Sequence, residues 1–276
     1  MTERIGLIAG SGQFPILFAQ AAQQRNWQIF AAAYREETDP ELNRHVDHLE
    51  WFYVGQINRL IKFFRENKIN RAVMLGAIHK PRAIANIRPD IKALALIARM
   101  RHTHDDALLR QFADMLTDEG IQILSSTILM PDLLASPGVW TRRKPTREEE
   151  GDIRIGWRIA KEIGRLDIGQ CVVIKKGSIM AVEAIDGTDA TIERGGRLAR
   201  GQAVVVKVCK PNQDTRFDVP AVGLQTIETM HAADVKTLAI EAGKALVFDR
   251  QAMIEQADAY QMTIIALDQS GFPEKA

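Results

Sequence analysis

Cysteine is almost absent from this sequence. Cys171 and Cys209 are the two among 276 residues, and both lie in apolar runs that are typical of buried strands. Two cysteines in such positions form neither a disulfide framework nor a zinc knuckle. We therefore expect two buried thiols and a reducing compartment, the cytoplasm.

An excess of charge and an aromatic surface are also missing. Lysine and arginine number 36 against 35 acidic residues, and Phe, Trp and Tyr make up 6% of the chain. A balanced charge exerts no long-range attraction on nucleic acid, and sparse aromatics argue against base stacking. We expect no nucleic-acid partner, so an anionic ligand has to be bound by a local cluster of cations.

Long apolar runs are lacking as well. No stretch approaches the roughly 18 apolar residues of a membrane span, and the N-terminus shows no basic segment followed by an apolar one. The chain is nevertheless 46% hydrophobic, which allows a full core, and its length allows two domains. We expect a chain that does not cross a membrane.

The first half alternates between strand and helix patterns. Strands are predicted at 4–9, 27–34, 71–78 and 120–126, and helices at 16–25, 58–67, 91–100 and 106–116. Such alternation favours a parallel sheet with right-handed crossovers. It predicts an α/β fold whose residues 1–130 form a Rossmann-like three-layer domain.

Prolines and glycine interrupt this pattern in a predicted linker, 131–148, whose basic run Arg142–Lys144 we expect to be solvated. Thr146 and Glu149 have the spacing of a capping box, which predicts a helix from 147 to about 163. A hairpin is predicted over 171–185, and further strands and helices follow to the end of the chain. Residues 149–276 are therefore predicted to form a second α/β domain with a mixed sheet.

A glycine turn, Gly10–Ser11–Gly12–Gln13, follows the first strand and opens a helix. Backbone N–H groups at a helix N-terminus bind anions, so this turn can hold a phosphate or a sugar. Pro15 stands where a dinucleotide fingerprint requires glycine, and no acidic residue ends the second strand, which argues against NAD. The alternative is a tight turn without a ligand.

Two other segments have residues suited to a polar ligand. Lys80 follows the strand 71–78, and ligands of open parallel sheets gather at the carboxyl ends of strands. Thr188 and Asp189 lie in the acid-rich turn VEAIDGTDATIERGG, which could bind a sugar hydroxyl or a divalent ion. The alternatives are a solvated lysine and a helix cap.

The segment KPNQDTRFDVP, residues 210–220, carries carboxylates and cations together. In an extended loop, Asp214, Arg216 and Asp218 would project to one side. Two carboxylates can bind Mg²⁺, and an arginine can pair with phosphate oxygens, a combination that suits phosphoryl chemistry. The alternative is a surface loop with local salt bridges.

Five segments in this order resemble one family, the UDP-2,3-diacylglucosamine pyrophosphatases of the lipid A pathway. They are GLIAGSGQFP, LGAIHKP, DDALLR, VEAIDGTDATIERGG and KPNQDTRFDVPAVG. The likeness is to the metal-dependent type that is not a calcineurin-like phosphoesterase, since the DxH and GNH[DE] motifs of the latter are missing. It implies Mg²⁺-dependent (or other divalent-ion-dependent) hydrolysis, with water attacking the sugar-side phosphorus to give 2,3-diacylglucosamine 1-phosphate (lipid X) and UMP.

The resemblance also implies roles for individual residues. The catalytic set would be Asp218, Asp214 and Arg216, with Asp218 the first choice for the essential carboxylate. Substrate-binding residues would be Gly10, Ser11, Gly12, Gln13, Lys80, Thr188, Asp189, Lys210 and Gln213. The metal ligands would be Asp214, Asp218 and Asp189. The glycolipid nucleotide would lie in a cleft between the domains, and the protein would be cytoplasmic and meet the inner-membrane surface transiently.

Two other hypotheses remain. One is a nicotinamide-dependent oxidoreductase, which measurable NAD(P)H binding would favour. The other is a non-catalytic protein that binds a nucleotide sugar or a lipid phosphate, for which Asp218→Ala would leave function intact.

Overall fold

The computed structural model describes residues 2–79, 87–99 and 105–268. Contacts between Cα atoms divide the chain into two compact units. The first unit comprises Met1–Pro131 together with Asp214–Asp218. The second unit comprises Asp132–Gln213 and Val219–Ala276.

The first unit is built on a five-stranded parallel sheet in the order β3-β2-β1-β4-β5. Its strands are β1 (Arg4–Ala9), β2 (Gln28–Tyr34), β3 (His48–Phe52), β4 (Arg71–Leu75) and β5 (Gln122–Ile123). Because β1 pairs with both β2 and β4, the direction of winding reverses between β1 and β4. The carboxyl ends of strands at such a switch point are where ligands bind in open α/β sheets.

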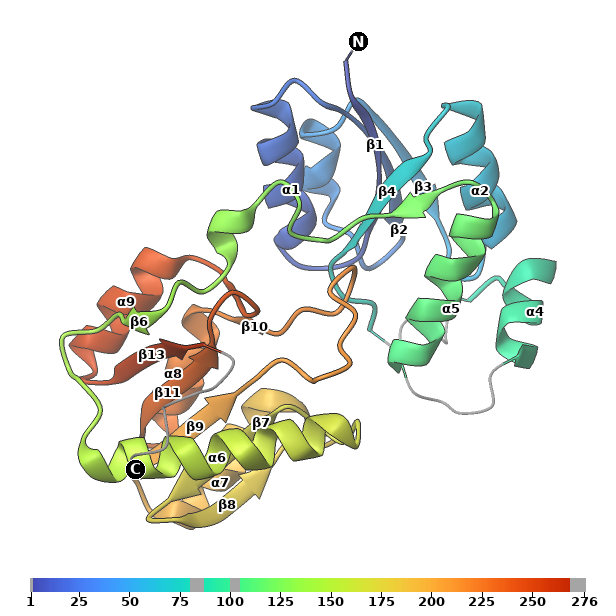
Figure 1. Ribbon diagram of the computed structural model, residues 1–276. Coiled ribbons are helices and arrows are strands. Elements are labelled where there is room, and N and C mark those ends of the chain that lie inside the picture. The colour runs from blue at the N-terminus through green and yellow to red at the C-terminus, as the bar shows by residue number, and fades with distance from the viewer. Residues whose placement is uncertain (1, 80–86, 100–104, 269–276) are drawn as a thin grey trace. The chain divides into compact units, whose positions relative to one another are not determined.

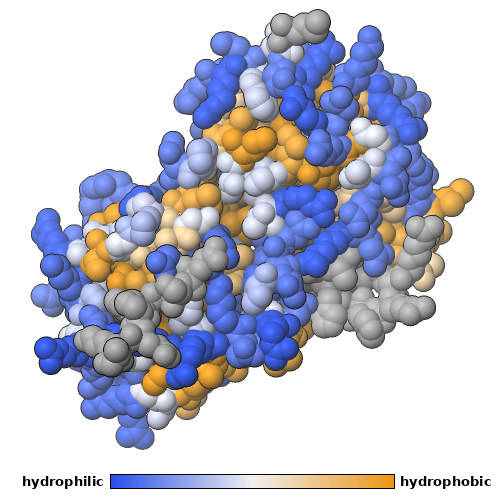
Figure 2. All heavy atoms as spheres, viewed as in Figure 1, coloured by the Kyte–Doolittle hydropathy of each residue, from blue (hydrophilic) through white to orange (hydrophobic). Residues whose placement is uncertain are grey.

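Helices cover both faces of this sheet, as a three-layer fold requires (Figure 1). They are α1 (Phe14–Gln23), α2 (Ile57–Glu66), α4 (Ile91–Arg99) and α5 (Asp105–Asp118), with a short 3-10 helix, η1 (Pro40–Arg44). In α2, Leu60, Ile61 and Phe64 recur at helical spacing and are buried in the core beneath the sheet. With the apolar side chains inside, most of the visible surface is hydrophilic (Figure 2).

The second unit has a six-stranded mixed sheet in the order β6-β13-β11-β9-β7-β8. The strands are β6 (Gly138–Val139), β7 (Cys171–Lys175), β8 (Ser178–Val182), β9 (Ala203–Lys207), β11 (Val235–Glu241) and β13 (Thr263–Leu267). β9, β11 and β13 run parallel, whereas β6, β7 and β8 pair antiparallel with their neighbours. A small parallel pair, β10 (Ala221–Val222) and β12 (Leu246–Val247), stands apart from it.

Two apolar cores flank the second sheet. α6 (Arg147–Arg165) packs Ile153 and Trp157 on one face, against Val172 and Val206 of the strands. The other face is covered by α7 (Gly187–Ala199), α8 (Leu224–Ala232) and α9 (Arg250–Ala259). A 3-10 turn, η2 (Pro131–Leu133), precedes β6. The predicted α/β class with a mixed second sheet is therefore confirmed.

Several local predictions can be compared with these elements. The capping box of Thr146 and Glu149 is present at the start of α6, and both thiols are buried. Burial raises the pKa of Cys171 to about 12, so this thiol stays protonated. The prediction of a solvated basic run is wrong for Arg143, whose guanidinium donates to Glu149 and Thr263 inside the second unit.

Candidate active site

The turns that follow β1 and β4 lie back to back at the carboxyl edge of the first sheet. The N–H of Gly10 donates to the carbonyl of Leu75 over 2.8 Å, and Ser11 and Ala77 exchange backbone hydrogen bonds of 2.8 and 3.2 Å. A Cβ on Gly10 would stand 2.4 Å from the carbonyl oxygen of Ala77, and one on Gly76 would stand 2.5 Å from that of Ser11. Glycine at positions 10 and 76 thus allows the two turns to touch at the point where the winding of the sheet reverses, between β1 and β4.

The predicted ligand-binding turn is consequently held at this switch point. The hydroxyl of Ser11 donates to the carbonyl of Ala77 over 2.9 Å, which leaves its oxygen able to accept a further bond. Gly12 has φ +89° and open space where a side chain would be, so a ligand could approach its backbone closely. Gln13 precedes α1, in which Pro15 occupies the first turn.

A buried carboxylate supports the segment that leads to Lys80. Glu37, which follows β2 and has a side chain only 2% exposed, accepts a bond from the N–H of His79 at 3.1 Å. Its other oxygen pairs with His79 Nδ1 at 2.7 Å. Lys80 itself lies outside the described residues. The role of Glu37 was missed from the sequence because no local motif links a glutamate to a histidine 42 positions later.

The segment Asp214–Asp218 forms a turn. The N–H groups of Phe217 and Asp218 both donate to the carbonyl of Asp214, at 3.2 and 2.9 Å. The prediction of an extended loop with three side chains on one side is therefore wrong. A single-turn conformation brings Arg216 back over Asp214, which alternation along a strand would not do.

This turn belongs to the first unit although it lies late in the chain. Ser126, just after β5, donates its hydroxyl to the carbonyl of Thr215 over 3.2 Å. Phe217 packs against the core of the first unit, beside α5 side chains of the same cluster. The second half of the sequence thus supplies a polar turn to the carboxyl edge of the first sheet, where the glycine turns also lie.

Asp214 and Arg216 form a close ion pair within the turn. The guanidinium donates to both carboxylate oxygens, at 2.7 to 3.1 Å, and the Asp214 side chain is 16% exposed. These bonds from Arg216 hold the pKa of the Asp214 carboxyl below its usual value against the opposing effect of burial. On α5, Arg110 adds a cation 4.0 Å from Asp214, and Asp114 lies 3.9 Å from Arg216. Asp214 is therefore ionised at neutral pH and orients the arginine.

The carboxylates of Asp214 and Asp218 could serve a magnesium ion that also takes waters and substrate phosphates as ligands. Within the described part of the chain, no group of three or more His, Cys, Asp or Glu side chains is arranged to hold a metal. Both oxygens of Asp214 accept hydrogen bonds from Arg216, so an ion bound by Asp214 would share this carboxylate with the arginine. Mg²⁺ is commonly bound by one or two carboxylates, waters and the substrate's own phosphates. The described donors are compatible with that arrangement.

Thr188 and Asp189 lie in the first turn of α7, in the second unit. The hydroxyl of Thr188 donates to buried Glu183 over 2.7 Å, and the second oxygen of Glu183 accepts from the N–H of Gln170. Asp189 is exposed, while Asp186 is paired with Arg194, which holds its pKa below the usual value. Asp186, Asp189 and Glu193 are all exposed, and of these Asp186 is held by Arg194.

Lys210 and Gln213 close a second turn of the same unit. The side-chain oxygen of Gln213 accepts from the N–H of Lys210 over 2.8 Å, and the ammonium group of Lys210 pairs with Asp167 at 2.8 Å. The division between the units runs between Gln213 and Asp214. The structure therefore brings Asp214, Arg216 and Asp218 together, and separately Lys210 with Gln213. Their roles stay predictions.

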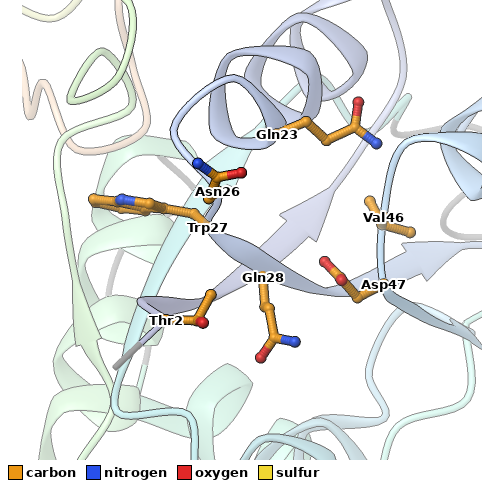
Figure 3. Close-up of a pocket in the computed structure, with 7 residues that line it drawn as sticks. All are labelled: Thr2, Gln23, Asn26, Trp27, Gln28, Val46 and Asp47. Carbon is orange, nitrogen blue, oxygen red and sulfur yellow. The ribbon is translucent and has the colours of Figure 1, made fainter.

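A polar surface pocket lies at the opposite edge of the first sheet (Figure 3). Its lining residues come from the beginnings of β1 and β2 and the approach to β3, among them Thr2, Trp27 and Asp47. The Asp47 carboxylate accepts from the N–H of Ile29 over 2.8 Å and so holds the backbone together. This pocket has no part in the site at the carboxyl edge.

Among the residues that the structure describes, no helix combines the length and apolarity needed to cross a bilayer.

Comparison with known proteins identifies a relative that matches nearly the whole chain. The UDP-2,3-diacylglucosamine pyrophosphatase LpxI of Caulobacter vibrioides is 32% identical over 276 residues, which cover 96% of this chain and 98% of that protein. Two solved structures show a distant similarity. The biotin carboxylase domain of Hydrogenobacter thermophilus 2-oxoglutarate carboxylase matches 72% of this chain and 42% of its own, at 14% identity and a TM-score of 0.28. The biotin carboxylase subunit of a pyruvate carboxylase matches at 13% sequence identity and a TM-score of 0.27. Neither score carries an argument about fold or function.

Family models account for nearly the whole sequence. Residues 4–133 match the LpxI N-terminal domain, and residues 136–265 match the LpxI C-terminal domain. The glycine turn and the switch point lie in the first match, and the acid-rich turns lie in the second. With both domains matched in order, and with a full-length relative, the chain belongs to the LpxI family.

Proposed function

We propose that this protein hydrolyses the pyrophosphate bond of UDP-2,3-diacylglucosamine to 2,3-diacylglucosamine 1-phosphate (lipid X) and UMP, a step of lipid A biosynthesis. The observation that carries this proposal is the end-to-end match to both LpxI domains and to a relative named for that activity. The position of the Asp214–Asp218 turn supports it, because carboxylates and a guanidinium lie at the sheet edge where phosphate ligands bind.

In this proposal Asp218 is the catalytic carboxylate. It accepts the proton of a water whose oxygen attacks the sugar-side phosphorus, the bond to the bridging oxygen breaks, and UMP leaves. Arg216 neutralises charge that develops on the phosphate oxygens, and Asp214 keeps its guanidinium in place through two hydrogen bonds. The backbone of Gly10–Gln13 and the side chain of Lys80 bind phosphate groups, as do Lys210 and Gln213 from the second unit.

We include Mg²⁺ in the reaction, with Asp218 as its main protein ligand and Asp214 and Asp189 as further candidates. The ion would neutralise the pyrophosphate and favour departure of the leaving phosphate. Thr188 and Asp189 are assigned to the substrate's sugar. The same proposal places the enzyme in the cytoplasm, with transient contact at the inner membrane where a diacylated substrate resides.

The test is release of UMP from UDP-2,3-diacylglucosamine in detergent micelles by the purified protein, with Mg²⁺ and with EDTA. We expect release with Mg²⁺, loss with EDTA, and loss in Asp218→Asn, which retains shape but cannot accept the proton. Asp132→Asn is the matched control, because Asp132 is an exposed carboxylate of η2 that belongs to none of the turns assigned to the site.

Two results would reject the proposal. Folded wild-type protein that releases no UMP under any metal condition would favour the binding-protein hypothesis. Asp218→Asn with full turnover would remove the turn from the catalytic role even if the activity itself stands. NAD(P)H binding measured in parallel tests the oxidoreductase alternative.

A further inference from the structure

Helix α4 (Ile91–Arg99) is apolar on both its inner and its outer side. Inward, Ala93 and Leu96 are 3% and 6% exposed and belong to the core of the first unit. Outward, every exposed position whose side chain is described is also apolar. These are Ile91, Leu94, Ala95, Ile97 and Ala98, which we call the α4 apolar face. A helix that is apolar all round is ordinarily buried, so this face requires a partner.

The exposure of this face is large. Ile91 is 81% exposed, Leu94 54% and Ile97 48%. Orange, hydrophobic atoms are visible in Figure 2 at the edge of the molecule where Figure 1 has α4. Among the α4 side chains that the structure describes, Lys92 is the charged one, and it pairs with Glu119, which Arg65 also binds. The described side chains of the apolar face therefore include no charged group.

Two cations border the face at the start of the helix. Asp90 caps α4 by accepting from the N–H of Ala93, and Arg88 lies just before it. The guanidinium carbon of Arg88 stacks 3.8 Å from the ring centre of Tyr53, and that of Arg35 lies 5.4 Å from the same ring. Both arginines are exposed, and neither forms an ion pair with a carboxylate in the part of the chain that the structure describes. Their charge is thus available to an anionic surface.

From these observations we infer that the α4 apolar face, with Arg35 and Arg88 at its edge, docks the protein on an anionic lipid bilayer. Apolar side chains of an interfacial helix enter the acyl boundary while neighbouring arginines meet lipid phosphates. The inference deepens the proposed function, because a substrate with two acyl chains has to be taken from a membrane. A bilayer is favoured over a protein partner by two features together: the exposed aliphatic side chains of α4, and the exposed guanidinium groups of Arg35 and Arg88, which form no ion pair among the described residues.

The test is co-sedimentation with vesicles of phosphatidylethanolamine and phosphatidylglycerol, compared with vesicles of phosphatidylcholine alone. We expect the wild type to bind the anionic vesicles. Leu94→Ser/Ile97→Ser should weaken the partition coefficient about tenfold for each side chain, the value of removing one inserted aliphatic group. Arg88→Gln should weaken binding about fivefold to anionic vesicles and leave phosphatidylcholine binding unchanged.

The matched control is Leu198→Ser/Ile168→Ser, whose side chains are 57% and 48% exposed in the second unit. It should bind vesicles as the wild type does. Equal binding by the α4 variant, or no binding by the wild type, overturns the inference. A wild-type dimer that the α4 variant abolishes, without vesicle binding, also overturns it and assigns the face to a second copy. Release of UMP from micelles, measured on the same samples, tests the proposed function separately because it requires no vesicle.

Discussion

At the scale of single residues, the two aspartates of the 214–218 turn have different surroundings. Asp214 is committed to Arg216, which donates to both of its oxygens. Asp218 lies at the end of the turn, and its N–H closes it by donating to the carbonyl of Asp214. The proposed function accordingly gives Asp214 the role of positioning the arginine and Asp218 the role of the catalytic carboxylate.

Replacing Asp214 tests this division of roles. Asp214→Asn should lower kcat about 10- to 100-fold, because losing a charge-assisted pair costs about 1.5–3 kcal/mol of arginine positioning. Asp214→Glu should recover part of the rate, since it restores the charge. The measurement is UMP release at saturating substrate. Unchanged kcat in Asp214→Asn would show that Arg216 needs no such partner.

Gly10 and Gly12 make a matched pair within one turn. A methyl group on Gly10 would meet the Ala77 carbonyl, so Gly10→Ala should destabilise the first unit by about 1–3 kcal/mol through overpacking. The same change at Gly12 meets no atom within 4 Å, and its cost is that of a positive φ, about 1 kcal/mol. Thermal unfolding should place the Tm of Gly10→Ala below that of Gly12→Ala. The reverse order would mean that the two glycine turns separate easily.

At the scale of elements, α6 is anchored by a carboxylate that is more than a cap. Glu149 accepts from the N–H of Thr146, from Arg143 and from the hydroxyl of Thr237. Burial raises the pKa of Glu149, but the hydrogen bonds from Arg143, Thr146 and Thr237 outweigh that effect and the pKa lies below its usual value. The start of α6 is thereby joined to β11 and to the segment before the helix.

The stability of the second unit should depend on pH through this group. Because the folded pKa of Glu149 is below the unfolded one, about 4.3, its contribution is fully present above that pH and is lost as pH falls through the folded pKa. Glu149→Gln should therefore have a lower urea midpoint than the wild type at pH 7, and the gap should narrow in acid. A gap that is constant with pH would show that the ionised form is not what stabilises the helix.

The sequence predicts elements well where periodicity or capping is local. The apolar spacing of α2 and the Thr146–Glu149 pair are both readable from the chain and are present in the structure. Strand β3 was missed because HLEWF mixes polar and apolar residues at an edge, where one side meets water. The sequence predicts an extended segment at Asp214–Asp218, whereas the structure has a turn, because the turn depends on bonds to Asp214 and on packing of Phe217 that no local pattern encodes.

At the scale of the whole molecule, sequence order and structural units do not coincide. The first unit includes the five residues Asp214–Asp218, which come after residues 132–213 of the second unit in the sequence. Candidate site residues were identifiable individually from the sequence, but their distribution between units was not, because it follows from long-range contacts such as Ser126 with Thr215. The order of the family's motifs can be read along the sequence whichever structural unit each motif belongs to.

Phe217 packs the segment Asp214–Asp218 onto the core of the first unit, so replacing Phe217 should affect that unit selectively. Phe217 is partly buried, so Phe217→Ala should cost less than the about 3–5 kcal/mol of a fully buried phenylalanine, and the loss should fall on the first unit. Hydrogen exchange should become faster in α5 and β5 and stay unchanged in β9 and β11. Faster exchange confined to the second unit would contradict the assignment of this segment to the first.

The late position of Asp214–Asp218 also has a consequence for biosynthesis. Domains fold as the chain is synthesised from its N-terminus, and the ribosome makes residues 1–131 first. The segment Asp214–Asp218, which belongs to the same unit, is made only after about 80 further residues. A nascent or prematurely terminated chain can fold the parallel sheet but lacks the turn with its carboxylates. Under the proposed function, catalytic competence would be acquired in the last quarter of translation, and truncated products would not consume the substrate.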